Sequence, residues 1–273
     1  MPVLEAPIIT ETTRIHKETE FEEHAQTDLE RELAMLSELE LPAEDGIPLE
    51  TNWHRIEMNL LIDSVHYHWR DHNDYFAGGN MFIYFNLEQA RRRDYRGPDF
   101  FVVKAVDGTR DRESWVVWRE AGRYPDVIVE LASPSTMTTD LGVKKLLYER
   151  TFHTQEYFCY DPGTTRLFGW QLTHGRYVEL QPNEHGWLWC EEIGVWLGSW
   201  QGEFQRVHAR WLRFYTNAGQ LVLTLAEAEA QRAEQQAQRA EHEAQRAQAA
   251  EAEIERLRAL LIEHGITHGE TDE

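Results

Sequence analysis

Two acidic residues and a lysine have the types and spacing that metal-dependent phosphodiester chemistry requires. Asp99 opens an apolar run after Gly97-Pro98, and Glu130 lies inside another apolar run, residues 127–131. An ionised carboxylate within a buried strand is costly unless it is paired or binds a cation. If the two strands are neighbours, both carboxylates can converge on one Mg²⁺ or Mn²⁺ ion, which prefers oxygen ligands.

A predicted helix that follows Glu130 supplies the cation. Lys144 comes four residues after Asp140 and therefore shares its helix face, and Tyr148 lies one turn further along that face. A lysine there would stabilise the negative charge that develops on a phosphate, or orient the attacking water. A salt bridge within the helix, beside a packed ring, is the alternative that the spacing leaves open.

Two further acids are weaker candidates for the same site. Asp126 shares the strand face of Glu130, but about 13 Å separates residues four apart on a strand. We therefore expect Asp126 to cap the strand or to support a metal ligand. Glu57 lies on the helix predicted for residues 54–69 and could reach a metal ion, although a solvated position on that helix is favoured.

Apolar periodicity places these residues in a mixed α/β or α+β domain, a β-sheet core flanked by helices. Besides the helix at 54–69, the pattern predicts a helix at 140–152. The predicted strands lie at 81–85, 99–106, 127–131 and 156–160, followed by a hairpin at 166–171 and 176–180 and an apolar stretch at 187–196.

The charge is carried by the two ends of the chain. The net charge of −21 divides into −10 for residues 1–45, −7 for residues 221–273 and only −4 for the part between them. The acidic arm 1–45 is expected to be partly disordered, with helical character at 27–39. Overall acidity argues against strong non-specific DNA binding. Arg91, Arg92, Arg93 and Arg96 could still line a basic groove, although a solvated loop is favoured.

Residues 221–264 predict a long alanine-rich helix. The segments AQRAEQQ, AQRAEHE and AQRAQAA, which begin at Ala230, form a seven-residue repeat whose alanines alternate in spacings of three and four. This is the pattern of a coiled-coil seam, and Ile254, Leu257 and Leu261 extend it with larger side chains. We expect self-association as a homodimer, and a lone solvated helix is the alternative. The domain is thus expected at 46–220, and residues 265–273 are expected to form a flexible tail.

The remaining composition favours a cytoplasmic protein. No apolar run approaches the roughly 20 residues that span a bilayer, and no signal peptide is visible. Cys159 and Cys190 form neither a disulfide framework nor a metal cluster, and both are expected in the core. No membrane partner is therefore expected.

The ordered set of motifs resembles the Uma-two family of bacterial restriction endonucleases. The resemblance covers about residues 50–200 and rests on Pro98-Asp99, the V-E-x-x-S-P-S-T run at 129–136 and the D-x-x-x-K-x-x-x-Y run at 140–148. It implies a restriction-endonuclease-like fold with a PD-(D/E)XK type of site, in which Asp99 and Glu130 bind the metal. The usual lysine two positions after Glu130 is absent, because Ala132 stands there, and the resemblance shifts this role to Lys144.

Two functions follow as hypotheses. The first is a Mg²⁺- or Mn²⁺-dependent endonuclease that hydrolyses DNA phosphodiester bonds by metal-activated water. The second is a scaffold or binding protein that keeps the nuclease fold without turnover and works through its coiled coil. A carboxylate inside a buried strand favours the enzyme, because a scaffold has little use for one.

Overall fold

The computed structural model describes Arg31, Ala34, Met35 and residues 51–92 and 97–264. Apart from those three positions, the acidic arm 1–45 and the helix expected at 27–39 lie outside the described residues, as do Arg93, Arg96 and the tail 265–273. The chain divides into two compact units. The described part of the larger unit is 51–79, 99–109 and 125–264, and that of the smaller is chiefly 80–92, 97–98 and 110–124.

The larger unit is built on a six-stranded sheet of order β1-β3-β5-β6-β7-β8. The strands are β1 (Tyr75–Gly78), β3 (Phe100–Lys104), β5 (Val127–Leu131), β6 (Glu156–Asp161), β7 (Arg166–Thr173) and β8 (Arg176–Glu179). Only β5 and β6 are parallel, and every other pair is antiparallel. Parallel neighbours need a crossover connection, and a helical segment between β5 and β6 supplies it.

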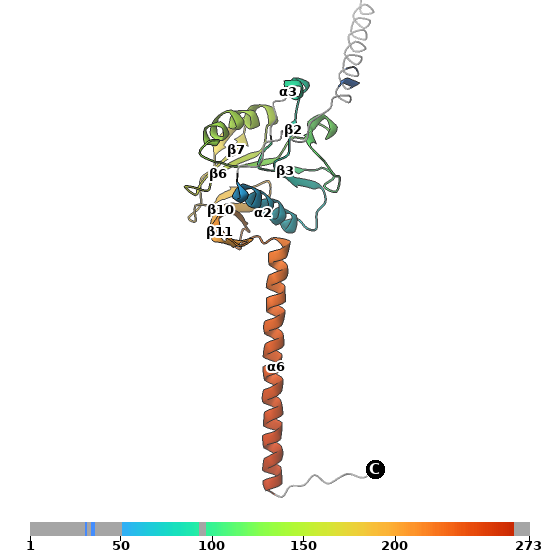
Figure 1. Ribbon diagram of the computed structural model, residues 1–273, viewed down its shortest axis with the longest axis vertical. Coiled ribbons are helices and arrows are strands. Elements are labelled where there is room, and N and C mark those ends of the chain that lie inside the picture. Colours follow the sequence, from blue (N-terminus) through green and yellow to red (C-terminus); the bar gives the residue numbers. More distant parts are fainter. Residues whose placement is uncertain (1–30, 32–33, 36–50, 93–96, 265–273) are drawn as a thin grey trace, which may run out of the picture. The chain divides into compact units, whose positions relative to one another are not determined.

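The two faces of this sheet are covered by different elements (Figure 1). Helix α2 (Asn52–His68) places Leu61 and Val65 in one core cluster with Val127 and Val129 of β5. Because side chains alternate along a strand, Glu130 points to the opposite face. On that face the crossover segment packs, as the ring contact of Tyr148 with Tyr157 shows.

The crossover is a helix with two wide turns. It consists of α4 (Met137–Thr139), η2 (Asp140–Lys144), α5 (Lys145–Leu147) and η3 (Tyr148–Phe152), and η2 and η3 are π-helical. Short π-helical segments inside α-helices occur frequently at functional sites. The sequence predicted this helix at 140–152 but not its wide turns, because hydrophobic periodicity does not distinguish closely similar helical windings.

A second sheet of order β11-β10-β9 completes the larger unit. It contains β9 (Leu188–Cys190), β10 (Val195–Phe204) and β11 (Val207–Tyr215). The sequence did not predict β11 or β1. Strand β11 carries Arg213, which is fully buried and donates to Glu227 at 3.0 and 2.7 Å. A charged residue inside a buried strand interrupts the apolar pattern by which a strand is predicted. Here the charge of Arg213 is paired with Glu227, which lies in the first turn of the helix that follows.

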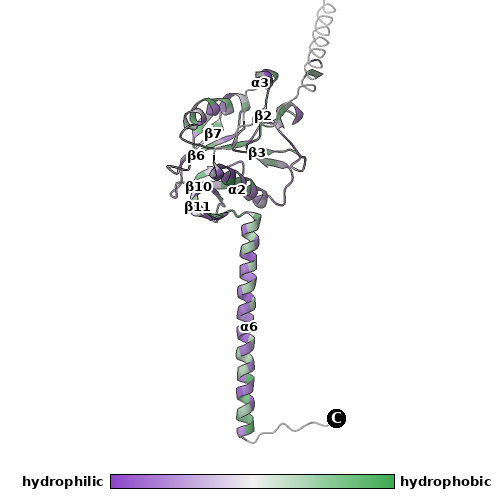
Figure 2. Ribbon diagram, in the orientation of Figure 1, coloured by the Kyte–Doolittle hydropathy of each residue, from purple (hydrophilic) through white to green (hydrophobic). Residues whose placement is uncertain are grey.

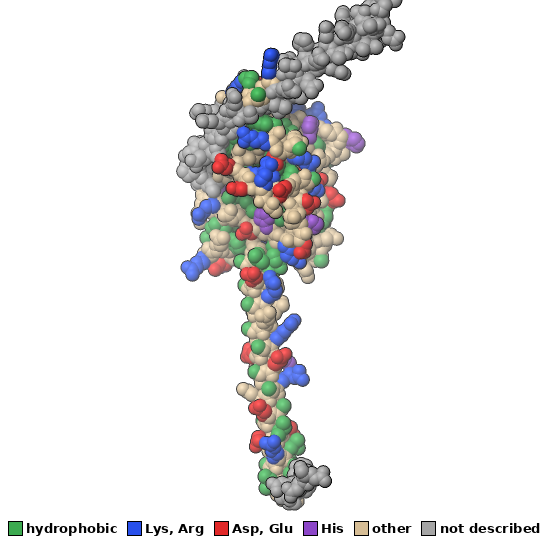
Figure 3. Space-filling view, turned by 90° about the vertical axis from the view of Figure 1, so that its right-hand side faces the viewer, with side chains coloured by type: hydrophobic (Ala, Val, Ile, Leu, Met, Phe, Trp, Pro, Cys, Tyr) green, Lys and Arg blue, Asp and Glu red, His purple; other side chains and the backbone are tan. Residues whose placement is uncertain are grey.

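Helix α6 (Leu225–Glu263) is the long C-terminal helix that the repeats predicted. Thr224 begins it with a capping box, in which its hydroxyl and the Glu227 carboxylate satisfy each other's backbone N–H groups. Ala228 is buried, whereas every residue from Glu229 to His264 is exposed. Apolar side chains therefore alternate with charged ones along an open helix surface (Figures 2 and 3).

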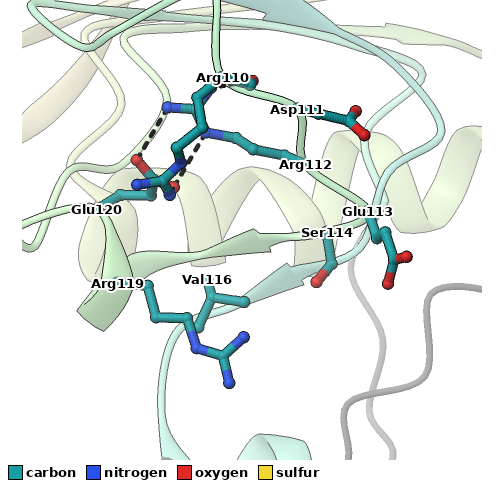
Figure 4. A pocket seen from close by; sticks show the side chains of 8 residues that line it. All are labelled: Arg110, Asp111, Arg112, Glu113, Ser114, Val116, Arg119 and Glu120. Atoms are coloured by element: carbon teal, nitrogen blue, oxygen red, sulfur yellow. Dashed lines mark hydrogen bonds and ion pairs between the residues drawn. The ribbon is translucent and has the colours of Figure 1, made fainter.

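The smaller unit pairs β2 (Ile83–Tyr84) in parallel with β4 (Trp115–Val116), beside α3 (Leu87–Arg92) and η1 (Val117–Arg119). Its pocket contains an arginine–carboxylate cluster: Arg110 and Arg112 both converge on Glu120, whereas the Arg119 side chain lies apart from them (Figure 4). Two nitrogens of Arg112 donate to the two carboxylate oxygens of Glu120, at 3.0 and 3.1 Å. Both side chains are almost fully buried. This bidentate geometry is the stronger form of an arginine–carboxylate pair.

The expected fold class, a mixed α+β core with a long C-terminal helix, is confirmed. The strands expected at 99–106, 127–131 and 156–160 and the hairpin at 166–180 are present, as is the helix at 54–69. The strand expected at 81–85 is shorter and lies in the small two-stranded sheet. Among the described residues, no helix is long and apolar enough to cross a membrane. Both cysteines are free and buried.

Candidate active site

The ends of β3 and β5 bring the two strand acids together. The ladder between these antiparallel strands runs to the pair Phe100–Val129, so the next positions along it are Asp99 and Glu130. Lys144 and Tyr148 reach Glu130 from the crossover helix on the same face. The structure thus brings together Asp99, Glu130, Asp140, Lys144 and Tyr148.

Asp99 is held by the backbone of the neighbouring strand. Its Oδ2 accepts a hydrogen bond from the Leu131 N–H at 2.7 Å. Burial raises the pKa of Asp99, while the Leu131 N–H, the charge of Lys144 and a side-chain hydrogen bond with Glu130 act against that rise. Two carboxyl groups form such a hydrogen bond only if one of them holds a proton.

Glu130 is the most strongly constrained acid of the site. It is fully buried, and its Oε1 accepts from the Tyr148 hydroxyl at 2.7 Å. Burial raises its pKa to about 8, the carboxylates of Asp99 and Asp140 add to the rise, and the ammonium group of Lys144 opposes it. A strongly perturbed buried carboxyl with specific charge partners marks Glu130 as a candidate for a functional site.

Lys144 lies between two carboxylates. Its Nζ is 3.0 Å from Glu130 Oε2 and 2.8 Å from Asp140 Oδ1. Burial alone would lower the pKa of Lys144, but Glu130 and Asp140 raise it above its ordinary value, so the side chain stays charged. The salt bridge with Asp140, which the spacing left open as an alternative, is present, and it directs the same lysine toward Glu130.

The wide helical turns explain why residues four apart align so well here. In an α-helix, with 3.6 residues per turn, positions four and eight residues apart rotate progressively away from one face. A π-helical turn holds more residues and reduces this rotation. Asp140, Lys144 and Tyr148 consequently all face Glu130 or its counter-ion, whereas Lys145 turns away and lies 4.1 Å from the centre of the Trp170 ring.

A close approach at Gly79 sets the position of Asp99 from the other side. A Cβ atom at Gly79 would lie 2.1 Å from the carbonyl oxygen of Asp99, which no side chain tolerates. Glycine is therefore required where the chain leaves β1, because the backbone of Asp99 occupies the space that any larger residue needs.

Two secondary candidates lie away from this cluster. Glu57 is fully buried rather than solvated, which corrects the favoured expectation, and its Oε2 accepts from the Leu212 N–H of β11 at 3.1 Å. Burial raises its pKa well above the ordinary value. Asp126 accepts from the Lys104 N–H at 2.7 Å and thus joins the start of β5 to the end of β3. This agrees with the strand-capping role expected for Asp126.

His54 contacts the backbone of Leu131, next to Glu130, and sequence reasoning did not select it. Its Nε2 lies 3.1 Å from the carbonyl oxygen of Leu131, which is 77 residues away in the chain. Every residue has a backbone carbonyl, so the type of the partner residue gives no sign of this contact in the sequence. The only local signal was the position of His54 in the first turn of α2, three residues after the cap Thr51.

The donor set fits a small divalent cation. Among the described residues, no group of three or more His, Cys, Asp or Glu is arranged to hold a metal ion. Mg²⁺, however, is commonly held by one or two carboxylates, with water and substrate phosphate as further ligands. Glu130 Oε2 has an ion pair with Lys144, and a carboxylate has enough lone pairs to accept from such donors and still coordinate a cation.

The fold and this cluster define the class as a mixed α+β protein with buried carboxylates and a lysine at the ends of β3 and β5. The chain belongs to the Uma2 family, described as "Putative restriction endonuclease", whose model matches residues 40–198. This is the family that the sequence motifs resembled. It implies a nucleic-acid substrate for the chain.

Among solved structures, the chain is similar to a protein from Anabaena variabilis titled as a putative nuclease belonging to DUF820. The identity is 15%, the TM-score is 0.39, and the match covers 55% of this chain and 81% of that one. Among curated proteins, none is significantly similar in sequence to the chain.

Proposed function

We propose that this protein is a Mg²⁺- or Mn²⁺-dependent endonuclease that hydrolyses DNA phosphodiester bonds. The single observation that carries the proposal is the buried Glu130, whose two oxygens face Tyr148 and Lys144 and whose neighbour is Asp99. Asp99 and Glu130 are the proposed metal ligands. A bound divalent ion would polarise the phosphoryl oxygen and lower the pKa of water.

The side chains of the site divide the remaining work. The Tyr148 hydroxyl fixes the Glu130 carboxylate, and Asp140 fixes the Lys144 ammonium group. Lys144, held beside the proposed ligands, stabilises the negative charge that develops on the phosphate in the transition state. The Leu131 N–H holds the carboxylate of Asp99 in line with Glu130. Such preorganised charges accelerate a reaction without reorganising during it.

Metal dependence is the direct test of the proposed chemistry. Supercoiled plasmid should be nicked by the full chain with Mg²⁺ or Mn²⁺, and an excess of EDTA should stop the reaction. Asp99→Asn should lower the rate by at least about 100-fold, because one of two charged ligands is lost. Nicking that persists in EDTA would contradict the metal mechanism. A folded wild-type chain inactive with both metals would favour the scaffold instead.

We further propose that α6 joins two copies of the chain as a coiled-coil homodimer. From Glu229 onward α6 is exposed, and it carries Ile254, Leu257 and Leu261 at spacings of three and four, each at least 37% exposed. An exposed helix that carries such an apolar seam favours a partner helix, because pairing buries the seam. The helix N-terminus is anchored by Arg213 and Glu227, which leaves the seam available.

Charge on the seam should separate the copies. Ile254→Glu, Leu257→Glu and Leu261→Glu together should halve the mass measured by light scattering, because like charges would face each other across the seam. The control combines Ala252→Glu and Ala259→Glu, which add charge on the opposite side of the helix and should leave the mass unchanged. A monomeric mass for the wild-type chain would contradict the homodimer.

A further inference from the structure

The backbone groups of Leu131, at the end of β5 beyond the last residue of β3, are held by two side chains near the site. Strand β3 stops pairing at Phe100–Val129, and the N–H of Ala132 already faces β6, where it donates to Tyr160 O at 2.8 Å. The N–H and C=O of Leu131 therefore face the side where β3 has ended. A strand edge with unpaired backbone groups needs other partners when it is buried.

Both groups of Leu131 find a side chain as partner. The N–H donates to Asp99 Oδ2 at 2.7 Å, and the carbonyl oxygen lies 3.1 Å from His54 Nε2. His54 comes from α2 on one face of the sheet, whereas Lys144 comes from the crossover helix on the other. The residue that follows Glu130 is thus held by an acid at its amide and by a histidine at its carbonyl.

The chemistry of these contacts fixes the orientation of the imidazole. A carbonyl oxygen can only accept, so Nε2 must carry the proton. Nδ1 lies 2.8 Å from the Thr51 hydroxyl, and that hydroxyl oxygen already accepts from the His54 backbone N–H at 3.3 Å. The hydroxyl proton is then available to Nδ1. His54 is 7% exposed and its ring packs edge-on against Trp53, so the ring has little freedom to turn.

We propose that His54 is a positioning residue of the nuclease site, which acts on Asp99 and Glu130 through the backbone of Leu131. This inference rests on the proposed function. The Nε2–H bond locks the end of β5, and the locked Leu131 N–H in turn holds the Asp99 carboxylate. Direct partners of metal ligands typically change metal affinity or activity by about 10- to 100-fold when they are removed. His54 acts one link further out, through Leu131, so we expect an effect near the lower end of that range.

The test compares two substitutions at His54 with a control on the same helix. His54→Phe removes the donor but keeps a planar ring, and His54→Gln retains an amide N–H at a similar reach. The control is His66→Phe, since His66 binds the Tyr75 hydroxyl at 2.9 Å and is part of the same helix. Circular dichroism melts check that each variant is folded at the assay temperature before its activity is compared with that of the wild type.

His54→Phe should lower the kcat for plasmid nicking and the affinity for Mn²⁺ by about 10-fold, with little change in the KM for DNA. His54→Gln should restore most of both, and His66→Phe should change neither. Wild-type values of kcat and Mn²⁺ affinity in a folded His54→Phe variant would overturn the inference. If the wild-type chain binds Mn²⁺ but does not nick DNA, the proposed function is wrong. The Mn²⁺ affinity of His54→Phe, compared with that of the wild type, then still tests the role of His54.

A spectroscopic measurement needs neither metal nor substrate. The ¹⁵N chemical shifts of the His54 ring in the full chain should show a protonated Nε2 bonded to Leu131 O. A neutral ring with its proton on Nδ1 would contradict the arrangement whatever the activity, because Nε2 could then not donate to a carbonyl.

Discussion

Glu130→Gln is expected to reduce metal-dependent plasmid nicking about a thousandfold, which corresponds to about 4 kcal/mol of transition-state stabilisation. Glutamine has the shape of glutamate and can still accept from the Tyr148 hydroxyl, 2.7 Å away in the wild-type chain. It lacks the charge with which a carboxylate binds a hard cation. The measurement is the rate of nicking at saturating Mg²⁺ and again at saturating Mn²⁺.

Stability should move in the opposite direction from activity in this variant. The pKa of Glu130 is about 8 in the folded chain and its ordinary value is 4.5. Between these values the folded chain binds more protons than the unfolded chain, so the contribution of Glu130 to stability falls as the pH rises. Glutamine does not titrate. Urea unfolding should therefore show that the variant gains stability relative to wild type from pH 5 to pH 8, and a relative loss would contradict the site electrostatics.

Lys144→Met is expected to lower nicking by about 100-fold or more, because a charge beside the developing phosphate charge is lost. The change also leaves Glu130 and Asp140 without the ammonium group that lies 3.0 and 2.8 Å from them. Since Lys144 holds down the pKa values of Glu130 and Asp99, their pKa values should rise further in the variant. Mn²⁺ binding near neutral pH should weaken and recover as the pH is raised.

Lys145→Met is the matched control, since it removes the same charge one residue away. Lys145 lies over the Trp170 ring and not beside the acids, so nicking and Mn²⁺ affinity should stay within about 2-fold of wild type. If both lysine variants lose activity equally, the effect is one of overall charge on DNA binding. In that case the special role of Lys144 is wrong.

The site residues that the sequence predicted most clearly are charged residues that stand in or next to apolar runs. Glu130 interrupts an apolar strand, and Asp99 opens one, so both acids stood out before the strands were known to be neighbours. The Asp140–Lys144–Tyr148 spacing was visible because a helix converts regular spacing into a shared face. The fold class followed from the same alternation of apolar runs, helices and turns.

The parts that the sequence did not predict depend on contacts between distant segments. His54 binds a backbone carbonyl 77 residues away, and every residue type has such a carbonyl. Glu57 resembled a solvated helix residue because its partners, the Leu212 N–H and the charge of Arg213, belong to a strand that the sequence did not predict. Arg213 interrupts the apolar pattern of that strand, and the group that pairs its buried charge, Glu227, lies in the next element, α6.

Anomalous diffraction from crystals grown with Mn²⁺ tests the central claim most directly. We predict an anomalous peak within coordination distance of both the Asp99 and the Glu130 carboxylates, with the Lys144 ammonium group beside it. The same crystals of Glu130→Gln should lose that peak. A wild-type crystal saturated with Mn²⁺ that shows no peak between these two acids, or a peak bound elsewhere in the chain, would contradict the account.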